Sequence, residues 1–449
     1  MKHEKFHYKT IEDVFNKEKE LAISLPLAKD TKILSQPLSV FGKVVPNRLG
    51  SAPMEGADSN PDGSPSDYTL NRYLKIAKGG VSIIWFEAIS VVEDGRSSNT
   101  QLLINDDNVD GFKKFTDSIK NAGLKKNGYA PLLIMQANHS GRYSNPDNKP
   151  SPRIAYHHQW LEQFRQADDS CIVSDDYLKK TEENFGKGAR LAKEAGFDAV
   201  DIKSCHGYLF QEVASAFYRH GIYGGSYENR TRLLKNSILA AKAYESDTFA
   251  ITSRIGIYDG YPEYCGFGQD LKTLEMDLNE PKKLVKELHH MGLKMVDLTM
   301  GNPYATTHIT RPFDAGKYIS PEHPFEGINR MIQGIGEVKR SVPDMIIYAS
   351  APTYLRQFSD LYSAGAIEDG LCDGMLFGRM QFANPEFANQ IIKNGRIDPK
   401  QVCLTCGMCG DLIRSHKPTG CVVRDRATFF PFYQEFLEEK KNLPKNFRG

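Results

Sequence analysis

The sequence predicts an α/β protein whose main part is a (β/α)8 TIM barrel, followed by a C-terminal cysteine-rich segment. Three observations support this prediction. A polar amphipathic helix, a glycine and a short apolar run recur in that order, as in LKIAKGGVSIIWF and ARLAKEAGFDAVDI. About eight such apolar runs fall between residues 50 and 378, and eight parallel strands close this barrel. Four cysteines gather after residue 400.

The expected strands are short and continuously apolar, because strands of a parallel sheet are buried on both faces. Glycine can close the helix before a strand by adopting a left-handed conformation. In chain order the runs are LGSAP, VSIIWF, APLLIM, FDAVDI, FAITSRIG, LKMVDLT, DMIIYAS and GMLFG. An open doubly wound sheet is the alternative. It is disfavoured because no GxGxxG follows the first run, and QGIGEVKRS lies in a helix-like stretch.

The chain is expected to divide into three parts. Residues 1–34 are charged and helical in pattern, residues 35–395 form the barrel, and residues 396–449 hold the cysteine cluster and a basic tail. Long polar insertions after the third, fifth and sixth strands are expected to reach over the barrel mouth. Either they serve ordinary loop packing or they provide an aromatic pocket lined by Tyr258, Tyr261, Tyr264, Phe267 and Tyr304.

Composition and charge indicate the expected location of the protein and the classes of partner it is not expected to bind. The 449 residues are 40% hydrophobic and 25% charged, with 57 Lys and Arg against 56 Asp and Glu. This balance points to neither nucleic acid nor a membrane surface as a partner. The charged N-terminus lacks the apolar core of a signal peptide, and no apolar run is long enough to span a bilayer. We therefore expect a cytoplasmic protein, in which clustered cysteines favour metal ligation over disulfides.

Four of the eight cysteines form a cluster in CLTCGMCGDLIRSHKPTGC. Cys403, Cys406 and Cys409 are separated by two residues each, and Cys421 follows after eleven more. Structural zinc usually takes two separated pairs of ligands, whereas three cysteines on one loop suit adjacent corners of a 4Fe-4S cubane. Because the spacing differs from the common ferredoxin run, a zinc site stays open as the alternative.

Polar and small residues follow the expected strands at the end where this fold carries its chemistry. Gln136 follows the third strand and Arg254 ends the fifth. The loops after strands seven and eight are the commonest phosphate site of the fold, and here they begin with Ser350, Ala351, Gly378 and Arg379. These strand ends therefore suit a polar heterocycle that carries a phosphate.

Four runs carry a resemblance to a known family: NRLGSAPM, QANHSGR, HGYLFQEVASAFYRHGIYGGSYENRTR and GRMQFANPEF. They are similar to the old yellow enzyme family of FMN-dependent NADH:flavin oxidoreductases. The cysteine cluster resembles the iron-sulfur branch of that family, which includes 2,4-dienoyl-CoA reductase and trimethylamine dehydrogenase. The resemblance covers about residues 35 to 425 and implies a 4Fe-4S cluster that exchanges electrons with the flavin.

The resemblance also implies where FMN binds and what reduces it. The FMN ring would pack against Pro53, Met54 and Ala88, its pyrimidine edge would bond Gln136, and Arg254 would place positive charge near N1 and O2. The four residues that begin the loops after strands seven and eight would hold the phosphate. We expect the protein to lack the C-terminal FAD- and NAD-binding domains of those relatives. NADH or NADPH at the flavin is therefore the expected donor, and an electron-transfer protein such as ferredoxin is the alternative.

The family places two nitrogen donors and a tyrosine after the fourth strand, where this chain has Lys203, His206 and Tyr208. The first donor is thus a lysine. The two donors would bind the carbonyl oxygen of an α,β-unsaturated substrate as hydride arrives from the flavin. Tyr208 would give a proton to the α-carbon, its acidity helped by the two cations, and Lys203 is expected to lower the pKa of His206.

The resulting hypothesis is an ene-reductase, an oxidoreductase acting on the CH–CH bonds of a ringed enone such as a steroid, a flavone or a cinnamate-like compound. Its oxygen-sensitive cluster would suit an anaerobic host, and a homo-oligomer is left open. Three alternatives remain. Lys203 could form a Schiff base in an aldolase-type barrel with a structural zinc, or merely an ion pair with Asp201 or another acid. The chain could also be an amine dehydrogenase or demethylase, although Lys203 would repel a cationic amine.

Overall fold

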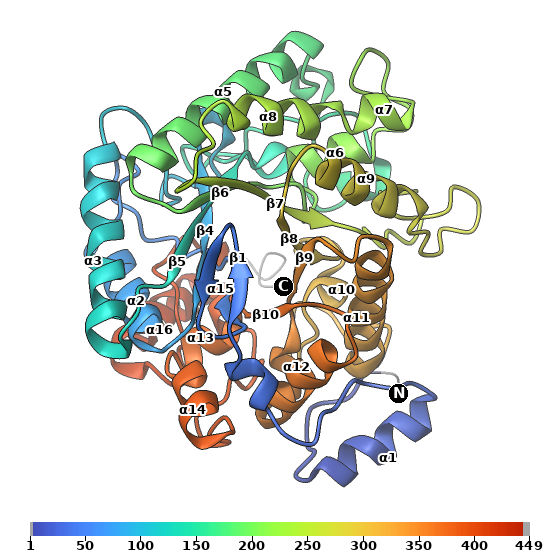
Figure 1. Cartoon of the computed structure of the whole chain (residues 1–449). Helices are drawn as coiled ribbons and strands as arrows, with labels where there is room; N and C mark the ends of the chain where they lie inside the picture. Colours follow the sequence, from blue (N-terminus) through green and yellow to red (C-terminus); the bar gives the residue numbers. More distant parts are fainter. Residues whose placement is uncertain (1–2, 443–449) are drawn as a thin grey trace.

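The computed structural model describes residues 3–442 and confirms the (β/α)8 barrel. Eight parallel strands close in the order β10-β3-β4-β5-β6-β7-β8-β9. Figure 1 shows them at the centre of a ring of helices. An open doubly wound sheet is excluded, because β10 pairs in parallel with both β9 and β3. The strands are β3 Leu49–Ser51, β4 Ile83–Ser90, β5 Leu132–Asn138, β6 Ala199–Ile202, β7 Ala250–Gly256, β8 Met295–Thr299, β9 Ile346–Ala349 and β10 Gly374–Phe377.

The helices pack their apolar stripes on the outside of the barrel. The buried face of α3 includes Phe112, Phe115 and Ile119, and this helix ends at Gly128 with the left-handed φ of 82° that the sequence pattern predicts. The stretch QGIGEVKRS lies inside α11, as expected of a helix. The outer helices are α2 Asp67–Lys78, α3 Val109–Asn127, α5 Asp175–Glu194, α8 Arg232–Lys242, α9 Asn279–His290, α11 Pro324–Ser341 and α12 Ser359–Glu368.

A small hairpin closes the end of the barrel where the strands begin. It consists of β1 Leu38–Val40 and β2 Lys43–Val45 and lies over the barrel centre in Figure 1. Val40 and Val45 pack in one apolar cluster with Trp85 and residues at the starts of several strands. This end is therefore filled by side chains, which leaves the opposite end for a ligand.

The N-terminal extension contains the helix α1, Ile11–Leu21, as its charged amphipathic pattern predicts. Before this helix, the rings of Phe6 and Tyr8 pack against Tyr354 and Phe325 of the barrel. Because the extension lies on the barrel in this way, the proposed boundary at residue 34 stays a prediction, as does the boundary at residue 395.

The C-terminal segment returns to the open end of the barrel. It contains α15 Met408–Arg414 and α16 Arg426–Asn442, and it follows α13 Arg379–Ala383 and α14 Phe387–Asn394. Leu412, Val422 and Phe429 form a small separate core. The backbone N–H of Thr419 donates to the carbonyl oxygen of Gly56 at 2.8 Å, which joins this segment to the loop after β3.

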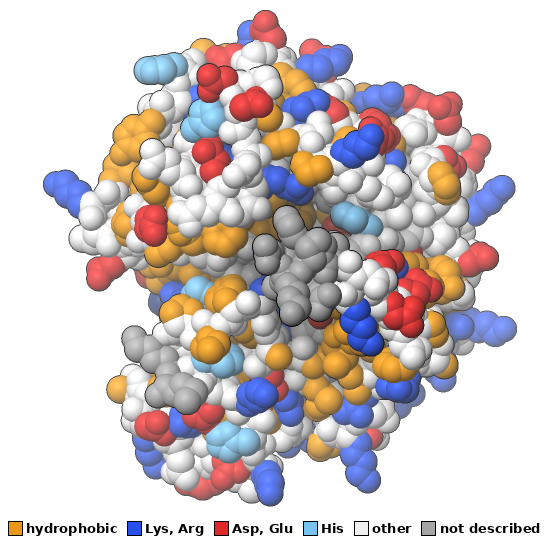
Figure 2. Space-filling view, turned by 180° about the vertical axis from the view of Figure 1, so that it is seen from behind, with side chains coloured by type: hydrophobic (Ala, Val, Ile, Leu, Met, Phe, Trp, Pro, Cys, Tyr) orange, Lys and Arg blue, Asp and Glu red, His pale blue; other side chains and the backbone are white. Residues whose placement is uncertain are grey.

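The surface charge is mixed. On the face opposite to that of Figure 1, acidic and basic side chains alternate with apolar ones, and no single-sign patch dominates (Figure 2). Within residues 3–442 we find no helix with the length and apolarity needed to cross a membrane.

Candidate active site

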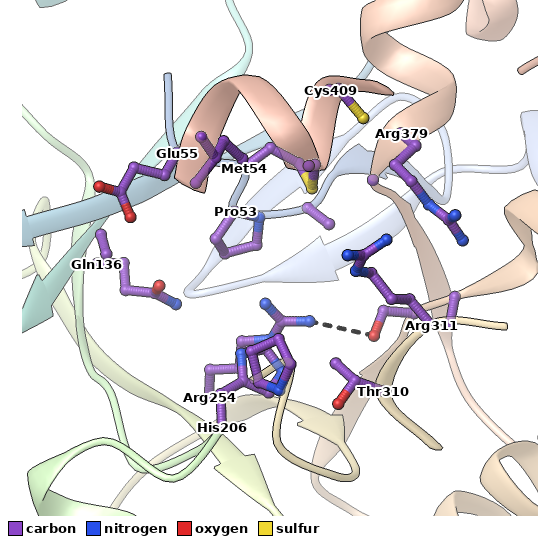
Figure 3. A pocket seen from close by; sticks show the side chains of 18 of the residues that line it. Pro53, Met54, Glu55, Gln136, His206, Arg254, Thr310, Arg311, Arg379 and Cys409 are labelled. Carbon is purple, nitrogen blue, oxygen red and sulfur yellow. Dashed lines mark hydrogen bonds between the residues drawn. The ribbon is translucent and has the colours of Figure 1, made fainter. Parts of the chain in front are cut away.

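One cavity at the C-terminal ends of the barrel strands brings together every residue predicted to bind the cofactor or to act on substrate. It has a volume of about 200 Å³, and its wall also includes residues from α15. Figure 3 shows side chains from several strands and loops pointing into it. The predicted residues on its wall are Pro53, Met54, Ala88, Gln136, Lys203, His206, Tyr208, Arg254, Ser350, Ala351, Gly378 and Arg379.

Asp201 on β6 organises the side of the cavity formed by β4, β5 and β7. Its Oδ2 accepts hydrogen bonds from Trp85 Nε1 and Gln136 Nε2, both at 2.7 Å. Its Oδ1 accepts a hydrogen bond from the backbone N–H of Arg254 at 2.6 Å. Burial raises the pKa of this carboxyl to about 6. Asp201 makes no ion pair with Lys203, so that alternative explanation of the lysine is wrong.

A break in the strand register places Ala88 in the cavity. The pairing of β4 with β5 shifts between Trp85 and Ala88, after which Ala88 lies directly opposite Gln136. A bulge of this kind re-aims the side chains that follow it. The Gln136 amide then turns toward Asp201, and its Oε1 has no hydrogen-bond partner among the described residues.

Arg254 is held by an acid and a hydroxyl. Its Nε lies 2.6 Å from Asp297 Oδ2, and its Nη2 donates to Ser350 Oγ at 3.2 Å, the dashed line in Figure 3. Burial raises the pKa of Asp297 to about 7, and the charge of Arg254 opposes that rise. The guanidinium is thus fixed between β7, β8 and the loop after β9.

Two arginines stand at the end of the cavity formed by β10 and the loop after β8. Arg379 donates from Nη2 to the Pro312 carbonyl at 2.7 Å, while its buried Nη1 has no hydrogen-bond partner in the described part of the chain. Arg311 lies beside it (Figure 3), and the structure gives its side chain no hydrogen bond or ion pair within residues 3–442. Burial, then the charge of Arg379, lowers the pKa of Arg311 to about 10. Uncompensated guanidinium groups fit a phosphate.

Sequence reasoning missed Arg311, Arg414 and Glu55, all of which line the cavity. Glu55 directly follows the predicted flavin residues Pro53 and Met54. Its position in the sequence could therefore have placed it at the cavity. Its Oε1 accepts from Ser97 Oγ at 2.7 Å, and burial raises its pKa. The two arginines had no such signal, because they come from α15 and from a loop far along the chain.

Lys203 projects into the cavity over the ring of Tyr208, with Nζ 3.7 Å from the ring centroid. Within residues 3–442 its ammonium forms no ion pair. Burial lowers the pKa of Lys203 to about 8, against the opposing charges of Cys205 and Glu55. Lys203 is therefore mostly protonated at neutral pH, but its pKa is close to that pH.

His206 has a left-handed backbone, with φ of 67°, and its Nε2 lies 3.3 Å from Thr299 Oγ1. Burial lowers its pKa well below 6.5, and the charges of Arg254 and Lys203 lower it further. The direction predicted for His206 is confirmed, although burial is the larger cause. At neutral pH the side chain is an uncharged imidazole.

Tyr208 differs from expectation. We expected nearby cations to help its ionisation, but burial raises its pKa well above 10, and Tyr304 and Glu55 raise it further. The physical cause of this correction is desolvation. Burial removes the water that would stabilise the phenolate, and this loss outweighs the stabilisation that a nearby ammonium provides. The Tyr208 hydroxyl lies 3.0 Å from the hydroxyl of Tyr304.

The expected aromatic pocket is also corrected. Of the five aromatic residues predicted for it, Tyr304 alone lines the cavity. Phe267 belongs to the main core, and Tyr261 packs against Trp160 at 5.3 Å between ring centroids. The loops fold back on the barrel, so most of their aromatic side chains serve loop packing.

The four clustered cysteines line a second, smaller cavity, which shares Arg379 and Cys409 with the first. Backbone N–H groups lie near two of the sulfurs: Thr405 N is 3.4 Å from Cys403 Sγ, and Arg424 N is 3.3 Å from Cys421 Sγ. Within residues 3–442, however, no three His, Cys, Asp or Glu side chains are arranged to hold a metal ion. The fold gathers these cysteines without showing a metal centre.

Comparison with known proteins gives consistent results. Residues 34–309 match the model of the NADH:flavin oxidoreductase / NADH oxidase family. The NADPH dehydrogenase of Bacillus velezensis is 30% identical over 253 residues, 55% of this chain and 71% of that protein. The cinnamate reductase of Clostridium sporogenes is 24% identical over 404 residues, 87% of this chain and 57% of that protein.

Solved structures share the fold. The complex of 2-naphthoyl-CoA reductase with 2-naphthoyl-CoA superposes with a TM-score of 0.71 at 17% identity, over 90% of this chain and 58% of that chain. Histamine dehydrogenase from Rhizobium sp. 4-9 gives a TM-score of 0.66 at 19% identity, over 87% of this chain and 52% of that chain. This chain thus spans little more than half the length of those two chains and of the cinnamate reductase. The family match covers most of the barrel, and the chain is an oxidoreductase that belongs to the NADH:flavin oxidoreductase / NADH oxidase family.

Proposed function

We propose that the protein is an FMN-dependent ene-reductase that uses NADH or NADPH to reduce the C=C bond of an α,β-unsaturated carbonyl compound. The observation that carries the proposal is the single cavity in which the expected flavin-binding residues lie beside Lys203, His206 and Tyr208. Family membership supports FMN and a nicotinamide donor.

The charged and hydrogen-bonding groups of the cavity wall suit FMN. Arg311 and the buried, unpartnered Nη1 of Arg379 would hold the phosphate, with Ser350, Ala351 and Gly378 beside them. Arg254 would lie near N1 and O2 of the ring, and the free Oε1 of Gln136 would accept from its pyrimidine edge. Bound there, FMN supplies the hydride that adds to the β-carbon of the substrate.

The residues of the chain have three tasks in this proposal. Lys203, as an ammonium, and His206, as a neutral imidazole N–H, donate hydrogen bonds to the substrate carbonyl oxygen and stabilise the charge that builds there. Tyr208 then gives a proton to the α-carbon. A high pKa suits this step, because it keeps the phenol protonated until the carbanionic α-carbon, a strong base, takes the proton.

The net charge of the cavity wall bears on which class of substrate can bind. Lys203, Arg254, Arg311, Arg379 and Arg414 line the cavity, against Glu55 as its acid. This excess of positive charge disfavours a cationic amine, and with it the amine dehydrogenase alternative. The aldolase alternative loses its support because the barrel belongs to a flavin oxidoreductase family. A ringed enone or a cinnamate-like compound, as in the name of the cinnamate reductase relative, fits the wall better.

We also propose that Cys403, Cys406, Cys409 and Cys421 bind a 4Fe-4S cluster. The donor set supports this, because the four cysteines line one small cavity beside Arg379 and two of their sulfurs lie near backbone N–H groups. The cluster would carry single electrons to or from the flavin side of the molecule, with an electron-transfer protein as its partner.

Anaerobic purification followed by a visible spectrum and an iron, zinc and flavin assay on the same sample tests both cofactors. Rapid mixing then tests the reaction. NADPH or NADH is expected to bleach the flavin bands, and 2-cyclohexen-1-one is expected to restore them. A colourless protein with one zinc would overturn the proposal, and so would a flavin that no enone reoxidises. If reduced ferredoxin bleaches the flavin and neither nicotinamide does, the proposed donor is wrong.

A further inference from the structure

We propose that Tyr304 relays protons from solvent to Tyr208, so that Tyr208 can donate again in the next catalytic cycle. This inference rests on the proposed function, because it takes Tyr208 as the donor to the substrate. It gives Tyr304 a role in proton transfer, whereas the sequence suggested only an aromatic lining.

The two tyrosines lie side by side on the cavity wall. Their hydroxyl oxygens are 3.0 Å apart. Tyr208 is only 6% exposed, whereas Tyr304 is half-buried. Within residues 3–442, Tyr304 is the hydrogen-bond partner that the structure gives the Tyr208 hydroxyl. The Tyr304 proton can therefore reach Tyr208 in one transfer, and a proton from solvent can restore Tyr304 in a second.

The Tyr304 hydroxyl is held in position by its neighbours. Its ring stacks on that of Tyr143 with centroids 3.8 Å apart and planes 16° apart. Asn302 ties the pair together, since its Oδ1 accepts from the Tyr304 N–H at 2.9 Å and its Nδ2 donates to the Tyr143 hydroxyl at 2.9 Å. The stack fixes the distance between the two hydroxyl groups that exchange the proton.

Both hydroxyl groups are protonated at neutral pH. Burial and Glu55 raise the pKa of Tyr304 to about 12, but the bond with Tyr208 and the charges of Arg414 and Arg165 oppose the rise. Burial, then the charges of Tyr304 and Glu55, raises the pKa of Tyr208 well above 10. After Tyr208 has lost its proton, the neutral Tyr304 hydroxyl at 3.0 Å is the acid that is placed to restore it.

The atoms and electrons of the cycle balance. NADPH or NADH supplies two electrons, which reach the β-carbon as a hydride. The Tyr208 O–H bond breaks as its proton bonds to the α-carbon, which completes the saturated carbonyl product. The Tyr304 O–H bond then breaks, its proton bonds to the Tyr208 oxygen, and a proton from solvent water restores Tyr304.

The test compares the first turnover with later ones in Tyr304→Phe, with Tyr348→Phe as the matched control. Tyr348→Phe also removes a buried phenol hydroxyl, but one that lies in the apolar cluster with Val40 and Val45 and has no hydrogen-bond partner among the described residues. FMN-loaded enzyme with excess NADPH is mixed anaerobically with excess 2-cyclohexen-1-one, and cyclohexanone is quantified in quenched samples. FMN content and melting temperature establish that each variant is folded and loaded.

The expected result is a burst. Tyr304→Phe forms the first equivalent of product per chain within about twofold of the wild-type rate, because Tyr208 starts protonated. Later turnovers slow by at least about tenfold, because reprotonation has lost its relay. Tyr348→Phe changes neither phase by more than about twofold, because Tyr348 does not line the cavity.

Two results would overturn the relay. If Tyr304→Phe slows the first equivalent as much as the later ones, Tyr304 only supports the structure of the cavity. If it slows neither phase, protons reach Tyr208 by another route. A wild-type enzyme that forms no cyclohexanone overturns the proposed function itself, and this inference with it, which separates the two kinds of failure.

Discussion

Lys203 shows how a single residue acquires its chemistry from its surroundings. Full desolvation brings its pKa from an ordinary 10.5 to about 8, although Cys205 and Glu55 pull it upward. A lysine on the surface would stay charged to much higher pH. In the cavity, the charge that the proposed carbonyl contact needs is lost just above neutral pH.

The first prediction concerns the pH dependence of this residue. Below pH 8 Lys203 keeps its proton and charge, and above pH 8 it loses both, so kcat/KM for 2-cyclohexen-1-one is expected to fall with a midpoint near pH 8. In Lys203→Arg the guanidinium stays charged, and the fall should be absent up to pH 10. Initial rates at saturating NADPH from pH 6 to pH 10 measure both profiles. An identical fall in the two proteins would assign the titration to another group.

Arg311 gives a second prediction at this scale. Its guanidinium has no acid partner in the described part of the chain, so its charge is available to a phosphate. Arg311→Met is expected to weaken FMN binding to the apoenzyme by about tenfold or more, the loss of one charge-assisted contact. Quenching of FMN fluorescence measures the affinity. The control is Arg190→Met on the surface of α5, where Arg190 pairs with Asp106. Equal affinities for the two variants would contradict the assignment.

At the scale of elements, helix α2 supports the loop that carries Pro53, Met54 and Glu55. Arg72 on α2 forms ion pairs with Asp58 in that loop and with Glu87 on β4, and all three side chains are buried. Glu87 in turn accepts from the Gly56 N–H at 2.8 Å. One buried cation thus joins a helix, a strand and the loop expected beneath the flavin.

Removing the Arg72 guanidinium is expected to lower the stability of the protein. Arg72→Met leaves two buried carboxyl groups without their partner, and we expect the free energy of unfolding to fall by about 3–5 kcal/mol. Urea denaturation measures the change. Lys75→Met, on the same helix but in an exposed ion pair with Asp425, should cost less than about 1 kcal/mol. A small effect in Arg72→Met would mean that the network adds little to stability.

At the scale of the whole molecule, the cysteine segment and the barrel share one wall. Cys409 and Gly410 of α15 line the large cavity, and Thr419 is bonded to Gly56 in the loop after β3. A group that orders the cysteine segment would therefore also affect the shape of the cavity at the strand ends.

The last prediction follows from this shared wall. Cys406→Ser is expected to lose most of the iron that the anaerobically purified protein carries, about four atoms per chain for a cubane. It should also retain less FMN after gel filtration, because α15 loses its anchor. Cys171→Ser, in a loop away from the cluster, should keep both. Unchanged iron in Cys406→Ser, or zinc in place of iron, would rule out the proposed cluster.

The sequence was sufficient for some of these features for clear physical reasons. Buried parallel strands must be continuously apolar, so the eight runs between residues 50 and 378 predicted the barrel that β3 to β10 form. Strand ends in this fold share one face, so residues such as Gln136, Lys203 and Arg254 could be placed together before the structure was known. The family followed from the motifs at those ends.

By itself, then, the sequence determined the barrel, the family and the set of strand-end residues, because these depend on local pattern and on a fixed topology. The tertiary structure decided what depends on contacts between distant segments: the raised pKa of Tyr208, its bond to Tyr304, and the placing of Arg311 at the cavity. It also decided that Phe267 packs in the main core and that Tyr261 packs against Trp160. Desolvation and hydrogen bonding arise only when the chain is folded, and no local pattern encodes them.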